Sequence, residues 1–304
     1  MEMVLRNPAE RIDDLQRGGC RIIQRPDLFC FGMDAVLLAA WAKVKPGQRV
    51  LDLCSGNGVV PILMDARMPE EIREAGSVSF AGVEINSTSV DLARRSARMN
   101  GQSGRIHFLE KDIRNVCRRK DAGKLENGHP CEDAGKPENG RPCEDVGKLE
   151  NGHPGKDAGK PRSERGGLDG EDAPESFDLV TVNPPYMTGG GGLTGESADK
   201  AIARHEVLCT IDDVAGAASR ALKSGGHLYM VHRPHRLGDL MHALEAHNLA
   251  LKRMRMVHPF ADREANLVLI DAAKGGRMYV HVEKPLVIYR QAGVYTEEVK
   301  ALYG

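Results

Sequence analysis

The four residues Asn183-Pro184-Pro185-Tyr186 follow directly on an apolar run, Phe177–Val182. Because proline has no backbone N–H, the two prolines end a strand and leave a rim of hydrogen-bond acceptors. The side-chain carbonyl of Asn183 and the backbone carbonyl of Pro184 could accept from the two N–H groups of a planar nitrogen. The ring of Tyr186 could stack on the group that carries this nitrogen. The alternative is a proline-rich strand end with a surface tyrosine.

Three carboxylates lie at the ends of other apolar runs. Asp52 precedes a glycine turn, Ser55-Gly56-Asn57-Gly58, Glu84 lies at the end of a second run, and Asp112 follows a third. A dinucleotide fingerprint requires glycine or alanine at position 61, which is Pro61 here. Acceptors for ribose hydroxyls, an amino group and cationic groups suit S-adenosylmethionine better. Without a ligand the three residues would be a turn cap, a solvated strand end and a helix N-cap.

The elements that would position these residues alternate along the chain. Apolar runs typical of strands occupy 49–54, 80–85, 106–109, 177–182, 227–231, 254–258 and 266–271, and helical patterns occupy 35–42, 59–66, 87–99 and 212–222. This alternation predicts an α/β fold with a mostly parallel seven-stranded sheet and helices on both faces. Since ligands bind at the carboxyl ends of such strands, the polar residues are expected to meet at one edge.

Residues 118–172 interrupt this pattern. Units of 12 residues open at Asp121, Asp133, Asp145 and Asp157, and the first reads DAGKLENGHPCE. These units are shorter than solenoid repeats and carry no apolar face. Such a segment cannot offset its ordering entropy, so we expect a disordered low-complexity loop. The chain then divides into an N-terminal segment, 1–48, that packs on a catalytic domain, 49–304, interrupted by the insert.

The composition argues against several classes of protein. The seven cysteines contain no CxxC pair, which disfavours disulfide frameworks and zinc ribbons and suits a reducing cytoplasm. His129, Cys131, Cys143 and His153 are loosely spaced within the repeats, so we expect no metal site. The net charge of −1 provides no global field for nucleic acid, although a local patch would suffice. No signal peptide or membrane helix is expected.

Several stretches together resemble one bacterial family. They are CRIIQRP (20–26), MDAVLL (33–38), LDLCSGNGVVPIL (51–63), GVEI (82–85), NPPY (183–186), AIARHE (201–206), VHRPHRL (231–237), VHP (257–259) and EAN (264–266). The chain is similar to the class I S-adenosylmethionine-dependent methyltransferases that methylate adenine N6 beside the anticodon of valine tRNA. This resemblance implies a Rossmann-like fold, S-adenosyl-L-methionine as cofactor, tRNA as partner and a cytoplasmic location. The repeat insert departs from the family pattern.

The resemblance also implies roles for individual residues. Asn183, Pro184 and Tyr186 would be catalytic, because the lone pair of an adenine amine is delocalised and acceptors on both N–H groups help the nitrogen to attack. Catalysis would be mainly positioning and electrostatics. The residues expected to bind the cofactor are Asp34, Asp52, Cys54, Gly56, Gly58, Glu84, Ile85, Asp112, Ile113 and Asn183.

Other residues allow two interpretations. Asp34 either contacts the methionine end of the cofactor or caps a helix, and Phe29 and Phe31 either shield the crevice or belong to the core. Arg204 and His205 either contact tRNA or support the fold. A final set is either a surface for phosphates or ordinary solvated charge: His232, Arg233, His235, Arg236, Lys252, Arg253 and Arg255.

Other functions stay open at this stage. N5 methylation of a glutamine in a peptide release factor presents the same planar nitrogen. An NAD(P)-dependent oxidoreductase is disfavoured by Pro61, and a non-catalytic RNA-binding module could use the same fold. Neither a monomer nor a homodimer is excluded.

Overall fold

The computed structural model describes residues 5–28, 30–118, 174–185 and 209–303. The residues described on the two sides of the repeats belong to one compact unit. Predictions that concern the repeat insert, Phe29, Tyr186, Arg204 and His205 lie outside the described residues.

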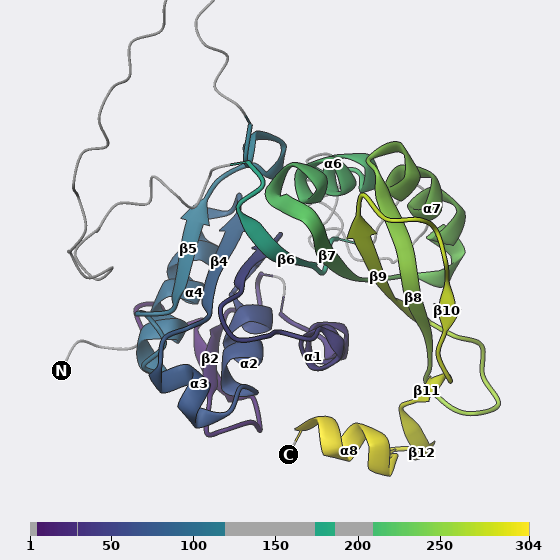
Figure 1. Cartoon of the computed structure of the whole chain (residues 1–304). Coiled ribbons are helices and arrows are strands. Elements are labelled where there is room, and N and C mark those ends of the chain that lie inside the picture. Colours follow the sequence, from purple (N-terminus) through teal and green to yellow (C-terminus); the bar gives the residue numbers. More distant parts are fainter. Residues whose placement is uncertain (1–4, 29, 119–173, 186–208, 304) are drawn as a thin grey trace, which may run out of the picture. The chain divides into compact units, whose positions relative to one another are not determined.

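A single sheet organises this unit (Figure 1). Its strands are β3 (Arg49–Leu53), β4 (Ser79–Glu84), β5 (Ile106–Glu110), β6 (Phe177–Val182), β7 (Leu222–His232), β8 (Leu249–His258), β9 (Leu267–Lys274), β10 (His281–Val282) and β11 (Leu286–Val287). The order is β10-β8-β9-β7-β6-β3-β4-β5, and β11 also pairs with β8. Within this sheet only β9 runs antiparallel to its neighbours. The mostly parallel sheet is confirmed, with two short strands more than predicted.

Helices cover both faces of the sheet. They are α1 (Met33–Trp41), α2 (Val59–Ala66), α3 (Glu70–Glu74), α4 (Ser87–Met99), α6 (Ile211–Ala221), α7 (Leu237–Ala246) and α8 (Glu297–Tyr303). Side chains of α1, α2, α4 and α8 share a core with Val50, whereas α6 and α7 share the other core with Leu51. Because successive strand side chains point to opposite faces, these two cores lie on opposite sides of the sheet. No helix in the described ranges is long and apolar enough to cross a membrane.

Local sequence explains where the main helices begin. The side chain of Asn86 accepts from the backbone N–H of Ser89 at the start of α4, and Thr210 and Asp213 form a reciprocal capping box at the start of α6. Pro61 is accommodated in the first turn of α2, where backbone N–H groups have no intrahelical partner. The short segment η1 (Ile113–Asn115) follows β5 in the same way, with Asp112 as its cap.

Several elements were not predicted from the sequence. They are α3, α7, α8, the η4 turn (Pro234–Arg236), and the hairpins β1 (Arg11–Asp14) with β2 (Arg21–Gln24) and β12 (Tyr289–Gln291) with β13 (Val294–Tyr295). The sequence also predicted that β7 begins at 227, after a glycine turn. This start is wrong, because β7 already pairs with β6 at Leu222 and a register shift between Phe177 and Leu179 absorbs the glycines.

The N-terminal hairpin packs on α4. The backbone N–H of Ile23 donates to Ser96 Oγ at 3.0 Å, and Arg95 forms a buried ion pair with Glu10 at 2.7 Å. The hydrogen bond from Arg95 holds the pKa of Glu10 at about 2. These contacts anchor the hairpin, although the division of the chain at residue 48 stays a prediction.

Gly82 in β4 lies against the buried ring of Phe108, and this close approach yields a test of the packing. A Cβ at position 82 would lie 2.5 Å from Phe108 Cδ1 and 2.6 Å from Ser55 Oγ. Gly82→Ala is therefore expected to lower the free energy of unfolding by about 1–3 kcal/mol. The matched control is Gly104→Ala, where no atom lies within 4 Å and a change within about 0.5 kcal/mol is expected. Urea unfolding measures both, and equal losses would contradict the close packing.

Candidate cofactor and substrate site

The carboxyl ends of β3, β4 and β6 lie side by side. Leu53 is paired with Val83 of β4 on one side and with Val182 of β6 on the other. The residues that follow these strands therefore meet at one edge of the sheet, as the sequence predicted. This edge brings together the glycine turn after β3, Glu84 at the end of β4, and Asn183 directly after β6.

The turn after β3 requires an unusual backbone. Cys54, Gly56 and Gly58 have φ angles of 55°, 52° and 84°. Only glycine fits at position 58, because a Cβ there would lie 2.5 Å from the Phe108 ring. Helix α2 begins at the next residue. The turn is fixed by the bond from Ser55 N–H to the carbonyl of Val83 at 2.9 Å. The sequence pattern thus forms a preorganised loop facing the strand ends.

Glu84 ties the turn to the end of β4. Its carboxylate accepts from the backbone N–H of Gly56 at 3.0 Å and from that of Asn86 at 2.9 Å. The side chain is buried. Each carboxylate oxygen can accept more than one hydrogen bond, so capacity remains for hydroxyl groups of a ligand. The neighbouring Ile85 is 38% exposed, which leaves an apolar side chain at the same strand end.

Several buried polar atoms at this edge of the sheet have no hydrogen-bond partner among the described residues. Asp52 accepts from Thr181 Oγ1 at 2.6 Å through Oδ1. Its Oδ2, the Ser55 hydroxyl and the Nδ2 of Asn57 are buried without a hydrogen-bond partner in the part of the chain that the structure describes. Buried polar atoms are normally paired, and several exceptions together at one strand end are a feature of ligand sites. The carboxylate oxygen of Asp52 and the amide donor of Asn57 are complementary to the polar and cationic groups of S-adenosylmethionine taken together. The sequence did not single out Thr181, whose only signal was a hydroxyl within an apolar run.

The protonation of Asp52 leads to a prediction about pH. Burial raises the pKa of its carboxyl group from 3.8 to about 7, and the hydrogen bond from Thr181 offsets part of the effect. Because the folded pKa is the higher one, the stabilising contribution is complete below pH 3.8 and is lost as the pH rises through 7. Without cofactor, unfolding free energy is expected to fall by roughly 3 kcal/mol between pH 5 and pH 8 from this group.

Asp52→Asn provides the comparison for this measurement. The variant does not ionise at position 52, so its unfolding free energy should lack this part of the decline. Urea unfolding at both pH values measures the difference. An identical pH dependence in the two proteins would show that Asp52 does not titrate in this range.

Asp112 and Ile113, which the sequence predicted as cofactor contacts, follow β5 and begin η1. Asp112 caps η1, accepting from Arg114 N at 2.8 Å, and it also pairs with the Arg114 guanidinium group. The hydrogen bond from Arg114 lowers the pKa of Asp112. Ile113 is buried in the core that contains α6. The structure thus supports the helix-cap interpretation of Asp112, and an adenine contact would have to share the carboxylate with Arg114.

Asp34 lies in the first turn of α1, one residue after its start. The helix begins at Met33 with Gly32 as N-cap, so the interpretation of Asp34 as the cap is wrong. Its Oδ1 lies 2.9 Å from the backbone N–H of Ala35. The nearby Phe31 packs against the core that contains α1, which favours its structural interpretation.

The acceptor-rich motif is described as far as Pro185. Asn183 is half-buried, Pro184 is buried and Pro185 is exposed. Asn183 is the first residue after β6, and Val182 before it is paired with Met230 of β7 as well as with Leu53. Asn183 and Pro184 therefore directly follow β6, which is the neighbour of β3, the strand that carries Asp52.

Cys54 has a neighbour that the sequence did not indicate. A hydrogen bond with the thiol of Cys209, together with burial, raises the pKa of Cys54 above its usual value. Both side chains pack against the core that contains α6. The two cysteines are 155 positions apart, so no local pattern could reveal the contact.

The seven basic residues considered for phosphate binding do not form one free surface. His232 is buried, and this burial lowers its pKa to about 4. Arg253 pairs with Asp271 and Glu283, and Arg255 pairs with Glu298. A phosphate role is thus wrong for His232 and disfavoured for these two arginines. Among the described residues, no group of His, Cys, Asp and Glu could hold a metal ion.

Comparisons with known proteins concern the sequence and the fold of the whole chain. No family model matches the chain. The sequence is 23% identical over 267 residues to the tRNA1(Val) (adenine(37)-N6)-methyltransferase of Aeromonas hydrophila, covering 88% of this chain and 85% of the relative. The enzyme of the same name from Yersinia pseudotuberculosis is 22% identical over 276 residues, covering 88% and 81%.

A solved structure supports the fold. The crystal structure of a predicted O-methyltransferase from Agrobacterium tumefaciens aligns with a TM-score of 0.57 and 22% identity, covering 89% of this chain and 95% of that one. The chain is similar in sequence to the tRNA1(Val) (adenine(37)-N6)-methyltransferases and has a Rossmann-like methyltransferase fold.

Proposed function

We propose that this protein transfers a methyl group from S-adenosyl-L-methionine to N6 of an adenine in the anticodon loop of valine tRNA. One observation carries the proposal: the acceptor residues after β6 lie beside the strand whose turn contains unpartnered buried polar atoms. The curated relatives support the choice of adenine in tRNA. We expect the enzyme to act in the cytoplasm, where this substrate occurs.

The residues at this edge of the sheet would have different roles. When bound, the cofactor supplies an electrophilic methyl group on a sulfonium centre. Glu84 would accept the ribose hydroxyls, Ile85 would pack on the adenine of the cofactor, and Asp52 would face its cationic end. The backbone of Gly56 and Gly58 would allow close approach to the ligand. Cys54, Asp34, Asp112 and Ile113 stay as secondary candidates for cofactor contacts.

The substrate amine would be held by acceptors. The side-chain carbonyl of Asn183 and the backbone carbonyl of Pro184 would each accept from one N–H of the amine. Tyr186 would stack on the base that carries it, a contact worth about 1–3 kcal/mol. No strong general base is required, because the amine loses its proton after it has received the methyl group. Positioning for in-line transfer would then provide most of the rate.

Labelled cofactor tests the proposal directly. The protein is incubated with labelled S-adenosylmethionine and with separate tRNA and protein fractions, and digested RNA is analysed by mass spectrometry. We expect label in tRNA as N6-methyladenosine. Label that enters only protein would reject the proposal in favour of glutamine N5 methylation. Binding of NADH without binding of S-adenosylhomocysteine, measured by calorimetry, would favour an oxidoreductase.

The repeat insert can be deleted to test how the chain is divided into domains. We propose that residues 118–172 are an insert in a loop of the catalytic domain, since the described residues on its two sides form one unit. Deleting 121–168 is therefore expected to leave the thermal unfolding midpoint and the methyl-transfer rate unchanged within about twofold. Differential scanning calorimetry and the labelled-cofactor assay measure the two quantities. Loss of either folding or transfer would assign the repeats a structural or functional role.

A further inference from the structure

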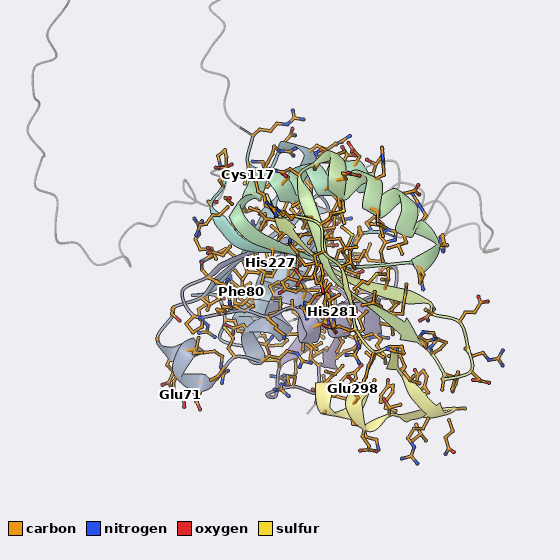
Figure 2. The ribbon with its side chains drawn as sticks, turned by 45° about the vertical axis from the view of Figure 1, so that its right-hand side comes forward. Glu71, Phe80, Cys117, His227, His281 and Glu298 are labelled. Carbon is orange, nitrogen blue, oxygen red and sulfur yellow. The ribbon has the colours of Figure 1, made fainter. Side chains whose placement is uncertain are left out.

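The segment between β9 and β11, residues 276–284, exposes three large apolar or aromatic side chains at the edge of the sheet. Tyr279 is 79% exposed, Val282 is 61% exposed and Met278 is 47% exposed. Figure 2 labels His281, which belongs to β10 within this segment. An exposed aromatic ring beside apolar side chains marks an interaction surface more often than an ordinary protein surface.

Basic residues lie close to Tyr279 in the chain. Arg277, His281 and Lys284 are exposed, and none of them forms an ion pair with a carboxylate in the described part of the chain. Lys252 of β8 approaches the same segment, where its ammonium group donates to the carbonyl of Arg277. The whole chain has a formal charge of −1, so this local excess of positive charge is a property of the segment. Such a patch is complementary to a polyanion.

The acidic residue of the segment is paired with Arg253, which it shares with Asp271. Glu283 accepts from Arg253 Nη1 at 2.6 Å and from Trp41 Nε1 at 3.1 Å. The guanidinium group of Arg253 also lies 4.6 Å from the centre of the Trp41 ring. These contacts anchor the segment to α1 and β8, in addition to the backbone bond from Glu283 N–H to Met254 at 2.9 Å. A surface held in this way loses little conformational entropy when it binds a partner.

We propose that residues 276–284 form a second contact surface for the tRNA substrate. Tyr279 stacks on an unpaired base, and Arg277, Lys284 and Lys252 contact phosphates. Aromatic rings interleaved with basic side chains are the combination that single-stranded nucleic acid recognises. The inference rests on the proposed function, because it supplies the remote binding of the RNA whose adenine enters the site at Asn183.

The position of the segment agrees with a large substrate. In the sheet order, β10 is separated from β6 by four strand spacings, which corresponds to roughly 19 Å. A free nucleotide at Asn183 cannot span this distance, whereas a folded RNA can. The surface is therefore expected to add affinity for tRNA and to have no effect on the methyl-transfer step itself.

Charge disfavours a second copy of the chain as the occupant. Pairing of β10 with β10 of another copy about a two-fold axis would bring the Arg277 and Lys284 side chains of both copies into one interface. Like charges opposite each other destabilise such a pairing. Pro285, which follows directly, also lacks the N–H needed to extend it.

Two variants and a matched control test the surface in the full-length protein. They are Tyr279→Ala, the double variant Arg277→Ala/Lys284→Ala, and the control Lys43→Ala/Lys45→Ala, which removes two exposed charges before β3. The probe is an unmodified valine tRNA transcript, with affinity measured by filter binding at several salt concentrations. Methyl-transfer kinetics, S-adenosylhomocysteine affinity and molar mass by light scattering are measured on each protein.

The expected effects differ between the variants. Tyr279→Ala should weaken tRNA binding about five- to 100-fold. The double variant should reduce the slope of log affinity against log salt by about 1.4–1.8, as expected for two lost phosphate contacts. Both should raise KM for tRNA with kcat unchanged, and the control should match the wild type. S-adenosylhomocysteine affinity should be equal in all four proteins.

The outcomes separate this inference from the proposed function. Unchanged tRNA affinity in both variants, with wild-type transfer intact, overturns the surface and leaves the function standing. If the wild type binds tRNA but methylates none, and the variants lose binding, the contact surface is supported and the proposed function is overturned. A wild type that neither binds nor methylates tRNA overturns both. A halved molar mass in Tyr279→Ala, with tRNA affinity unchanged, would assign the surface to a second copy instead.

Discussion

Replacing Asn183 with alanine is expected to lower the rate of methyl transfer at least about 100-fold, the size of effect seen when one preorganised hydrogen-bonding group is removed from an active site. Asn183 is the first residue after β6, at the sheet edge that also carries the turn after β3. Its side-chain carbonyl would accept from the substrate amine, and alanine has no group that can do so. Transfer of label from S-adenosylmethionine to a valine tRNA transcript measures the loss.

The same variant is expected to retain its cofactor and its fold. S-adenosylhomocysteine affinity by calorimetry and the thermal unfolding midpoint should both match the wild type, because the loss concerns the reacting nitrogen. Asn7→Ala, an exposed asparagine in the N-terminal segment, is the matched control and should keep full activity. Activity in Asn183→Ala close to that of the control would show that the amine is held by other groups.

Replacing Glu84 with alanine is expected to lower cofactor affinity roughly 10- to 100-fold. The carboxylate holds the N–H groups of Gly56 and Asn86, at 3.0 and 2.9 Å, and it would also accept the ribose hydroxyls. A hydrogen bond to a charged group contributes about 1.5–3 kcal/mol, so the loss of one ribose contact already accounts for this range. Calorimetric titration with S-adenosylhomocysteine measures the affinity.

The neighbouring strand provides the control for Glu84. Glu110 is paired with Glu84 at the end of β5 but is exposed, so Glu110→Ala should bind the cofactor as the wild type does. Glu84→Gln keeps one carbonyl oxygen and should give an intermediate affinity if the alanine variant has disturbed the turn. Equal affinity in Glu84→Ala and Glu110→Ala would contradict the role of Glu84 as the ribose acceptor.

The two predictions separate the two halves of the site. In the proposed function, Glu84 would hold the cofactor against the turn after β3, whereas Asn183 would hold the substrate nitrogen that meets it from the side of β6. A variant that loses only binding and a variant that loses only transfer would therefore distinguish cofactor recognition from alignment of the amine. The pH dependence predicted for Asp52 addresses the same turn through stability and requires no substrate.

The amino-acid sequence by itself determined the α/β alternation, the main strands and the edge at which their polar residues gather. These features depend on local periodicity, on glycine at positions with positive φ, and on prolines that end a strand, all of which a linear pattern records. The roles proposed for Asn183 and Glu84 likewise came from residue types at strand ends. The 12-residue repeats were also evident, because repetition is visible without a structure.

Only the tertiary structure decided which side chains are paired with one another. Thr181 holds Asp52, Arg114 holds Asp112, and Cys209 meets Cys54 across 155 positions. The sequence could not reveal that His232 is buried, nor that Tyr279 and Arg277 lie at a sheet edge with positive charge. These properties depend on contacts between distant segments and on the loss of water around each group, which local sequence does not specify.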